Sequence, residues 1–537
     1  MSVNSSVTSM STPLSVASID KAPHPIYKVI FLGFVVGALI YIGVELASDL
    51  STTPPLSFLP YLMLGFALLI ALGFEFVNGF HDTANAVATV IYTNALPAPA
   101  AVVLSGVANF TGVMMASGAV AYGILALLPV ELILNVGSNQ GFAMVFALLL
   151  AAIVWNLGTW AFGIPASSSH TMIGSIIGVG LMNQILAPAG IASSSVDWGQ
   201  ALKVGKALLL SPILGFAVAG GIFLLSKLLF SRKPELFEPP VGHEPPPFWI
   251  RGLLVLSCAG VSFFHGSNDG QKGMGLIMLI LIGIVPMGYS LNKTMDATQV
   301  QAFAALSEKT ANVLSPTAPT ITLSQSRDVL THYLQDHKVN AQVLPAIAVV
   351  ETNVSLAVSR YGTFDKVPAD ATRNMRNDMY LASASMKRLD KDNALPTMTA
   401  AQKDVIKANG QSLDNTTQFI PTWVKVAVAL ALGLGTMVGW KRIVVTVGEK
   451  IGRSPLNYGQ GLAAQLSTMA MIGAADKFGL PVSTTHVLNG SVAGTMTANK
   501  SGLQWSTVKS ILSAWVLTLP AAITLSATLY WIFVQFI

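Results

Sequence analysis

Long apolar stretches dominate this 537-residue chain and constrain its fold more than any other feature. The hydrocarbon core of a bilayer is about 30 Å thick, so a helix that crosses it needs roughly 20 apolar residues. Only 10% of the residues are charged, whereas soluble domains usually carry about 25%. The chain is therefore predicted to be an all-α integral membrane protein. Suitable segments occur at 28–48, 58–78, 98–126, 141–163, 204–230, 249–267, 272–290, 422–440 and 508–535.

Three shorter, glycine-rich segments near 167–186, 460–475 and 484–498 raise the predicted number of transmembrane helices to about 10–12. The serine-rich tail 1–26 is expected to be disordered, and residues 27–57 to form an additional N-terminal span that is too long for a signal peptide. The remaining predicted parts are a first transmembrane repeat (58–230), a basic cytoplasmic loop (231–248), the start of a second repeat (249–290), a water-exposed polar insertion (291–420) and the rest of the second repeat (421–537).

Basic loops indicate which side of the membrane faces the cytoplasm. The segments 231–251 and 441–453 are rich in Lys and Arg, so both are predicted to be cytoplasmic. The insertion mixes acidic and basic residues, has an amphipathic helical pattern at 375–389, and is one span away from the second basic loop. It is therefore expected on the non-cytoplasmic side. No basic run is interleaved with aromatic residues, so a nucleic-acid partner is not expected.

An internal repeat organises the apolar part of the chain. The segment Gly79–Asn85 has a counterpart at Gly266–Lys272, and Pro165–Thr171 has one at Pro481–Val487, in the same order. The two motifs of each half are 83 and 212 residues apart, and the difference of 129 nearly equals the length of the polar insertion. Paired interruptions of apolar segments in two halves are typical of the binding site of a transporter.

Acidic residues stand inside the apolar segments of both halves. Asp82 and Asp269 occupy equivalent positions of the repeat, and a charge at the bilayer centre costs roughly 2.5–3.5 kcal/mol unless it faces a cavity, an ion or a partner. Glu75, Asn78 and Asp82 share one face of a helix, where two carboxylates could hold a cation or share a proton. His265 and Asp269, one turn apart, could form a proton relay or be a satisfied interface pair.

The hydroxyl-rich motifs are the predicted anion-binding elements. Gly163 and Gly479, each with a proline two residues later, should break a helix, so that three hydroxyls begin the next helical piece. Hydroxyls both donate and accept hydrogen bonds, as hydrogen phosphate requires. Ordinary N-capping is the simpler explanation for one such motif, but duplication favours binding. The predicted substrate-binding residues are Ser167, Ser168, Ser169, Ser483, Thr484, Thr485, Asn85, Gln271 and Lys272.

Lys272 could contact substrate, neutralise Asp269 or extend to the membrane interface. The single cysteine, Cys258, allows no disulfide and no cysteine-based metal site. No G-x-x-x-x-G-K-[ST] sequence is present, so transport driven by ATP within this chain is not expected.

The motifs around Asn78–Ala86, Pro165–Thr171, His265–Gly273 and Pro481–Val487 resemble those of the inorganic phosphate transporter (PiT) family, and the likeness is greatest to its bacterial low-affinity branch. The resemblance implies inverted repeats with re-entrant helical hairpins at the Ser/Thr motifs and a homodimer in the bacterial cytoplasmic (inner) membrane. No covalently bound cofactor is expected. It also implies proton-driven symport of hydrogen phosphate or of a neutral complex with a divalent metal. Carried over by position, Asp82, Asn85 and Asp269 would serve ion coupling and substrate contact, and Asp82 and Asp269 could contact the metal.

Departures from the family pattern bear on the coupling ion. His81 stands where the first motif usually has Asn, and Lys272 stands where the second often has Asn. A cation at 272 would repel sodium, so proton coupling is predicted, with sodium coupling as the alternative. The sequence also leaves open transport of sulfate or another oxyanion on the same scaffold, and an enzyme that acts on a lipid-borne phosphate.

Overall fold

The computed structural model describes residues 25–51, 53–55, 57–187, 196–240, 245–315, 320–395 and 398–536. The predicted disordered tail 1–26 lies almost wholly outside these residues. Within them the regular structure is helical, apart from one bridge between Gly452 and Leu503. The helices are α1 (Pro25–Ser51), α2 (Phe58–Tyr92), α3 (Ala98–Met115), α4 (Ala119–Leu125), α5 (Val130–Leu134), α6 (Asn139–Ala161), α7 (Ser168–Leu186), α8 (Trp198–Leu229), η2 (Pro234–Leu236), α9 (Phe248–Ile284), α10 (Pro286–Tyr289), α11 (Ala297–Leu314), α12 (Leu323–Asp336), α13 (Val343–Tyr361), η3 (Phe364–Lys366), α14 (Ala369–Lys391), α15 (Ala400–Thr417), α16 (Thr422–Thr436), α17 (Lys441–Glu449), α18 (Tyr458–Lys477), α19 (Thr484–Ala498) and α20 (Trp505–Val534).

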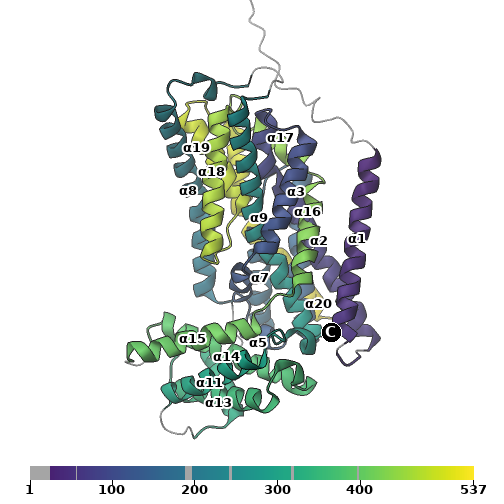
Figure 1. The fold of residues 1–537 in the computed structure, drawn as a ribbon, viewed down its shortest axis with the longest axis vertical. Coiled ribbons are helices and arrows are strands. Elements are labelled where there is room, and N and C mark those ends of the chain that lie inside the picture. The colour runs from purple at the N-terminus through teal and green to yellow at the C-terminus, as the bar shows by residue number, and fades with distance from the viewer. Residues whose placement is uncertain are drawn as a thin grey trace, which may run out of the picture.

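The long apolar helices form a bundle whose outer surface is itself apolar (Figure 1). Leu209 and Leu228 of α8 are 68% and 74% exposed, and Val29 of α1 is 70% exposed. A continuous exposed apolar surface is costly in water but is the normal surface in lipid. The chain is therefore a multi-pass membrane protein, as its composition predicts.

The sequence-based prediction of transmembrane spans is wrong in two places. The segments 249–267 and 272–290 are not separate spans, because α9 is one continuous helix that carries the motif Gly266–Lys272 through the bundle. The segment 98–126 is not one span, because α3 ends before Gly118, whose φ of 90° begins α4. Apolar character alone does not locate either feature, since a polar motif can sit inside a helix and a break can sit inside an apolar run.

Eight described helices are long and apolar enough to cross a membrane, and the bent pair α15–α16 would make nine. One of the eight, α13, packs against α11, α12 and α14, outside the bundle (Figure 1). Several bundle helices, such as α7, α18 and α19, are too short or too polar for the same criterion. The predicted 10–12 transmembrane helices thus remain a prediction.

The polar insertion forms a helical domain, defined here as α11 to α15. Its core contains Phe303, Leu330, Ile347, Met379 and Leu413. Met375–Leu389 lies within α14, as the amphipathic pattern predicts.

The helical domain docks on the bundle through polar contacts. Arg376 Nη1 donates to Ile133 O (3.3 Å), and Asn377 Nδ2 donates to Leu134 O (3.3 Å). In Figure 1 this domain lies at the opposite end of the bundle from α17 in the second basic loop. If the second basic loop is cytoplasmic, as predicted, the helical domain at the opposite end of the bundle lies on the non-cytoplasmic side.

Two pairs of consecutive helices, α6–α7 and α18–α19, pack together as helical hairpins. At the open end of the α6–α7 hairpin, Gln140 Nε2 donates to Asn183 Oδ1 (3.0 Å). At the open end of the α18–α19 hairpin, Gln460 Nε2 donates to Ser501 Oγ (3.3 Å). The N-termini of α7 and α19 meet inside the protein.

Candidate functional site

The two Ser/Thr motifs adopt the predicted helix breaks with the same local structure. Gly163 and Gly479 have φ angles of 66° and 62°, a conformation that glycine adopts without a steric penalty. Ser167 and Ser483 then cap α7 and α19: each side chain accepts a hydrogen bond from the N–H three residues later, at 3.1 Å. These two serines are therefore occupied as N-caps, and the hydroxyls after them begin the helices.

Those hydroxyls converge with both aspartates. Ser168 Oγ lies 2.9 Å from Asp82 Oδ2 and 3.3 Å from Asp269 Oδ2. Thr485 Oγ1 donates to Asp82 Oδ1, and Thr484 Oγ1 is buried without a hydrogen-bond partner. Residues from α2, α7, α9 and α19 thus form one cluster, which we call the central site.

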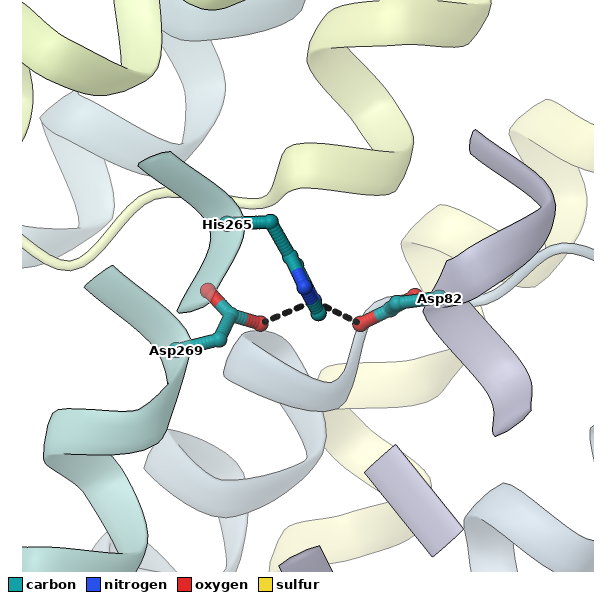
Figure 2. A group of neighbouring side chains, drawn as sticks. All are labelled: Asp82, His265 and Asp269. Carbon is teal, nitrogen blue, oxygen red and sulfur yellow. Dashed lines mark ion pairs between the residues drawn. The ribbon is translucent and has the colours of Figure 1, made fainter. Parts of the chain in front are cut away.

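His265 lies between the two carboxylates, as Figure 2 shows. Its Nε2 is 3.8 Å from Asp82 Oδ2 and 3.5 Å from Asp269 Oδ2, while Nδ1 is 2.7 Å from Asn109 Oδ1. One ligand atom from each of His265, Asp82 and Asp269 lies within 4.8 Å of the others. Two carboxylates and an imidazole are suitable ligands for a divalent cation.

Lys272 is buried and forms an ion pair at the central site. Its Nζ is 2.6 Å from Asp269 Oδ2, and both side chains are 0% exposed. Extension of this lysine to the membrane interface is therefore ruled out in this structure, and neutralisation of Asp269 is the arrangement observed.

Glu75 and Asn78 lie beside this ion pair. Asn78 Nδ2 donates to Glu75 Oε2 at 3.5 Å, and Glu75 Oε1 is buried without a hydrogen-bond partner. Gly273 makes the close approach of α2 and α9 possible here, because a Cβ at 273 would lie 2.3 Å from Glu75 Cγ. Glu75 is thus a third buried carboxyl group, after Asp82 and Asp269, in this region of the bundle.

Three other predicted residues have different placements. Ser169 Oγ donates to Val482 O at 2.7 Å and so joins the two helix breaks. The Gln271 amide is used elsewhere: Nε2 donates to Ser267 O (2.7 Å) and Asp476 Oδ1 (2.8 Å), and Oε1 accepts from Val120 N (2.9 Å). Asn85 belongs to α2, but its side chain lies outside the described part of the chain.

Three histidines of the motifs and an aspartate of α18 lie near these residues, although the sequence did not predict that they act. His81 Nδ1 is 3.3 Å from Asp82 Oδ1 and Nε2 is 3.3 Å from Thr159 Oγ1. His170 and His486 follow the two hydroxyl triplets, and their rings lie 4.5 Å apart. Asp476 accepts from Ser267 Oγ at 2.7 Å. Its position three residues before Gly479, at the end of an apolar helix, is the signal that could have identified it.

The central site is closed to bulk solvent. Asp82, Ser168, Asp269 and Thr484 are 2%, 1%, 0% and 2% exposed. These four residues are therefore buried inside the bundle and do not face the surrounding lipid. Binding or release of any solute there requires the surrounding helices to move.

Comparisons with known proteins identify the same part of the chain. Residues 78–526 match the model of the phosphate transporter family. The low-affinity inorganic phosphate transporter PitA of Escherichia coli K12 is 44% identical over 501 residues, which cover 89% of this chain and 97% of that protein. The corresponding PitB is 42% identical over 495 residues, with the same coverage. A solved structure described as the sodium-dependent phosphate transporter has a TM-score of 0.48 and 19% identity, over 88% of this chain and 100% of that one.

The relatives are named as transporters, not as enzymes. This agrees with the prediction that the chain is not an enzyme and weighs against a membrane enzyme for lipid-borne phosphate. The residues matched by the family model, 78–526, include all four motifs that form and surround the central site.

Proposed function

Because this chain belongs to the phosphate transporter family, we propose that it is a proton-coupled symporter that imports inorganic phosphate across the bacterial inner membrane by alternating access. Phosphate is the substrate of that family. Family membership does not specify the coupling ion, the ionic form in which phosphate binds or the alternating-access movement of the helices. These three points are what the proposal adds.

The shared contact of Ser168 with two carboxyl groups carries the proposal. A serine hydroxyl has one proton to donate, yet its oxygen lies within 3.3 Å of both Asp82 Oδ2 and Asp269 Oδ2. Both contacts are hydrogen bonds at once when one of the carboxyl groups is protonated and donates to the serine. The site is thus built to hold a proton between two acids.

Charge balance explains why substrate entry needs cations. Lys272 offsets Asp269, which leaves Asp82 and the adjacent Glu75 as further acidic groups. Two like charges 4 Å apart repel by about 4 kcal/mol at an effective dielectric constant of 20. A hydrogen phosphate dianion can therefore bind only if protons or a metal ion arrive with it.

A divalent metal could enter as part of the substrate. His265 Nε2 and Asp269 Oδ1 are buried without hydrogen-bond partners, so both have a lone pair available for a ligand. With Asp82 they form the group of neighbouring ligand atoms at the central site. A neutral metal–phosphate complex would reduce the charge repulsion without requiring a second proton.

Lys272 supports protons rather than sodium as the coupling ion. Its ammonium group is the cation closest to Asp269, at 2.6 Å, and a sodium ion at this carboxylate would have to displace it or sit beside a like charge. The tethered cation therefore makes a sodium ion at this position unnecessary.

The N-termini of α7 and α19 are the proposed phosphate-binding elements. Helix N-termini present unpaired N–H groups and a partial positive charge, and Ser168 and Thr484 add hydroxyls at this point. Sulfate is the alternative substrate. It is fully deprotonated and needs only donors, whereas hydrogen phosphate also donates to acceptors such as Asp82.

Opposed hairpins support alternating access. In this proposal the α6–α7 and α18–α19 hairpins enter the membrane from opposite sides, and the rings of His170 and His486 lie 4.5 Å apart where the hairpins meet. This is the arrangement expected of inverted repeats with a site at their interface. A homodimer remains a prediction from the family resemblance.

Transport by the purified protein in liposomes tests the proposal. Radiolabelled phosphate uptake should follow an imposed pH gradient, acidic outside, and should be insensitive to replacement of sodium by potassium at constant pH. Unlabelled phosphate should compete far better than sulfate. Uptake that follows a sodium gradient and ignores the pH gradient would refute proton coupling, and effective competition by sulfate would reassign the substrate.

A further inference from the structure

We propose that a basic cavity beside α17 is a second binding site, separate from the central site, for the phosphate group of an anionic ligand. The ligand is either an anionic phospholipid or free inorganic phosphate. The cavity has a volume of about 340 Å³. We call it the α17 pocket; its walls include Phe162 and Gly163 of the α6–α7 turn and Lys441, Arg442, Thr446 and Lys450.

The α17 pocket concentrates positive charge. Three of its wall residues are Lys441, Arg442 and Lys450, and no acidic residue belongs to its walls. The neighbouring acid, Glu449, accepts a hydrogen bond from Tyr92 OH at 2.7 Å. Among the described residues, Arg442 and Lys450 form no ion pair, so their charge is available to an anion.

Arg442 is held in a fixed position with donors to spare. Its Nη1 donates to Ala161 O at 2.8 Å, and its guanidinium lies 4.8 Å from the centre of the Trp160 ring. This hydrogen bond uses one of the five N–H groups of the guanidinium. A guanidinium fixed by stacking is well suited to bind a phosphate oxyanion through two parallel hydrogen bonds.

Aromatic residues flank the α17 pocket. Phe162 in its wall is 82% exposed, the half-buried Trp160 is two residues before it, and the half-buried Trp440 directly precedes the wall residue Lys441. Aromatic rings collect at membrane–water interfaces, and basic pockets on the cytoplasmic side are typical sites for lipid phosphates. Helix α17 also lies towards the end of the bundle opposite to the helical domain (Figure 1).

The α17 pocket is connected to the helix break that positions Ser168. Thr446 Oγ1 donates to Gly163 O at 2.9 Å, and Gly163, with its φ of 66°, starts the break that ends at the N-cap Ser167. An anion bound between the α6–α7 turn and the cations of α17 would add further contacts between these two elements, beside the hydrogen bond from Thr446 to Gly163. Its occupancy should therefore restrain the α6–α7 turn.

Thermal unfolding of the full-length protein in detergent tests the lipid source. Phosphatidylglycerol, but not phosphatidylcholine, should raise the melting temperature of the wild type. The double variant Arg442→Gln/Lys450→Gln should show about thirtyfold weaker apparent affinity for phosphatidylglycerol, because each cation near an anionic headgroup contributes about five- to tenfold. The matched control is Arg232→Gln/Lys233→Gln, which removes two exposed cations from the other basic loop and should respond like the wild type.

Inorganic phosphate tests the free-anion source in the background of Asp82→Asn, which disables the central site. A phosphate-dependent rise in melting temperature that persists there, and that is lost on adding Arg442→Gln/Lys450→Gln, would assign the α17 pocket to free phosphate. Lys450→Gln alone serves if the double variant does not fold, since Lys450 makes no side-chain hydrogen bond among the described residues. If the pocket variants respond to both probes as the control does, the proposal is wrong. These measurements report binding and remain interpretable whatever ion drives transport.

Discussion

Removal of the Lys272 ammonium group should leave Asp269 as an unpaired charge in the interior of the bundle. The two groups are 2.6 Å apart, and both side chains are completely buried. The substitution of choice is Lys272→Gln, which keeps much of the side-chain volume. Losing one partner of a buried ion pair costs about 3–5 kcal/mol, most of it from the desolvated charge that remains.

A double-mutant cycle separates this effect from a loss of packing. Asp269→Asn alone should also destabilise the protein, whereas Asp269→Asn/Lys272→Gln removes both charges and should recover most of the loss. The expected coupling energy is about 3 kcal/mol. The free energy of unfolding would be measured in mixed detergent micelles by the fluorescence of the nine tryptophans.

An exposed ion pair supplies the control for this cycle. Lys387 and Asp414 of the helical domain form a 2.5 Å pair, with side chains 53% and 25% exposed. Because solvent screens such a pair, Lys387→Gln should cost less than about 1 kcal/mol. If the Lys272 and Asp269 substitutions are additive, or if Lys272→Gln costs no more than the control, the buried pair does not have the role assigned to it.

Four further outcomes are expected. Asp82→Asn should abolish uptake driven by a pH gradient while the protein stays folded by circular dichroism, and wild-type uptake would exclude this carboxylate from coupling. Ser168→Ala and Thr484→Ala should each raise the KM for phosphate about tenfold, because each removes a hydroxyl that would hydrogen-bond the charged phosphate in the proposed complex. An effect of only one substitution would contradict a site shared by both motifs. Lys272→Asn should make uptake respond to sodium, and uptake as insensitive to sodium as the wild type would remove the argument from the tethered cation. Glu351 lies in the core of the helical domain, where burial raises its pKa from 4.5 to about 7. Because its pKa is higher in the folded than in the unfolded protein, its contribution to the free energy of unfolding should be fully present below about pH 4.5. This contribution should fall by up to about 3 kcal/mol as the pH rises through 7. Glu351→Gln should remove this loss in thermal unfolding of the full chain at pH 5 and pH 8, and an equal pH dependence in variant and wild type would count against the raised pKa.

The sequence alone was sufficient for the class of protein and for most of the central site. Apolar length determines membrane insertion because bilayer thickness is fixed, and the exposed apolar surface of α8 agrees with it. Repetition of the acid and hydroxyl motifs identified Asp82, Asp269, Ser168 and Thr484 as a set, since unrelated caps or buried charges would not recur at matching positions. Glycine with a proline two residues later located both helix breaks because the backbone preferences of these residues are local.

Only the tertiary structure decided how those residues use their polar groups. Hydrophobicity does not reveal that α9 continues through its polar motif, because partners from other helices satisfy that motif. Gln271 looked equivalent to the other motif residues, but contacts from α4 and α18 use its amide. Lys272 pairs with Asp269, three residues before it on α9, but the burial of this pair depends on the other helices that pack around α9. Side-chain partners across helices are set by packing in three dimensions, which a pattern along one chain does not encode.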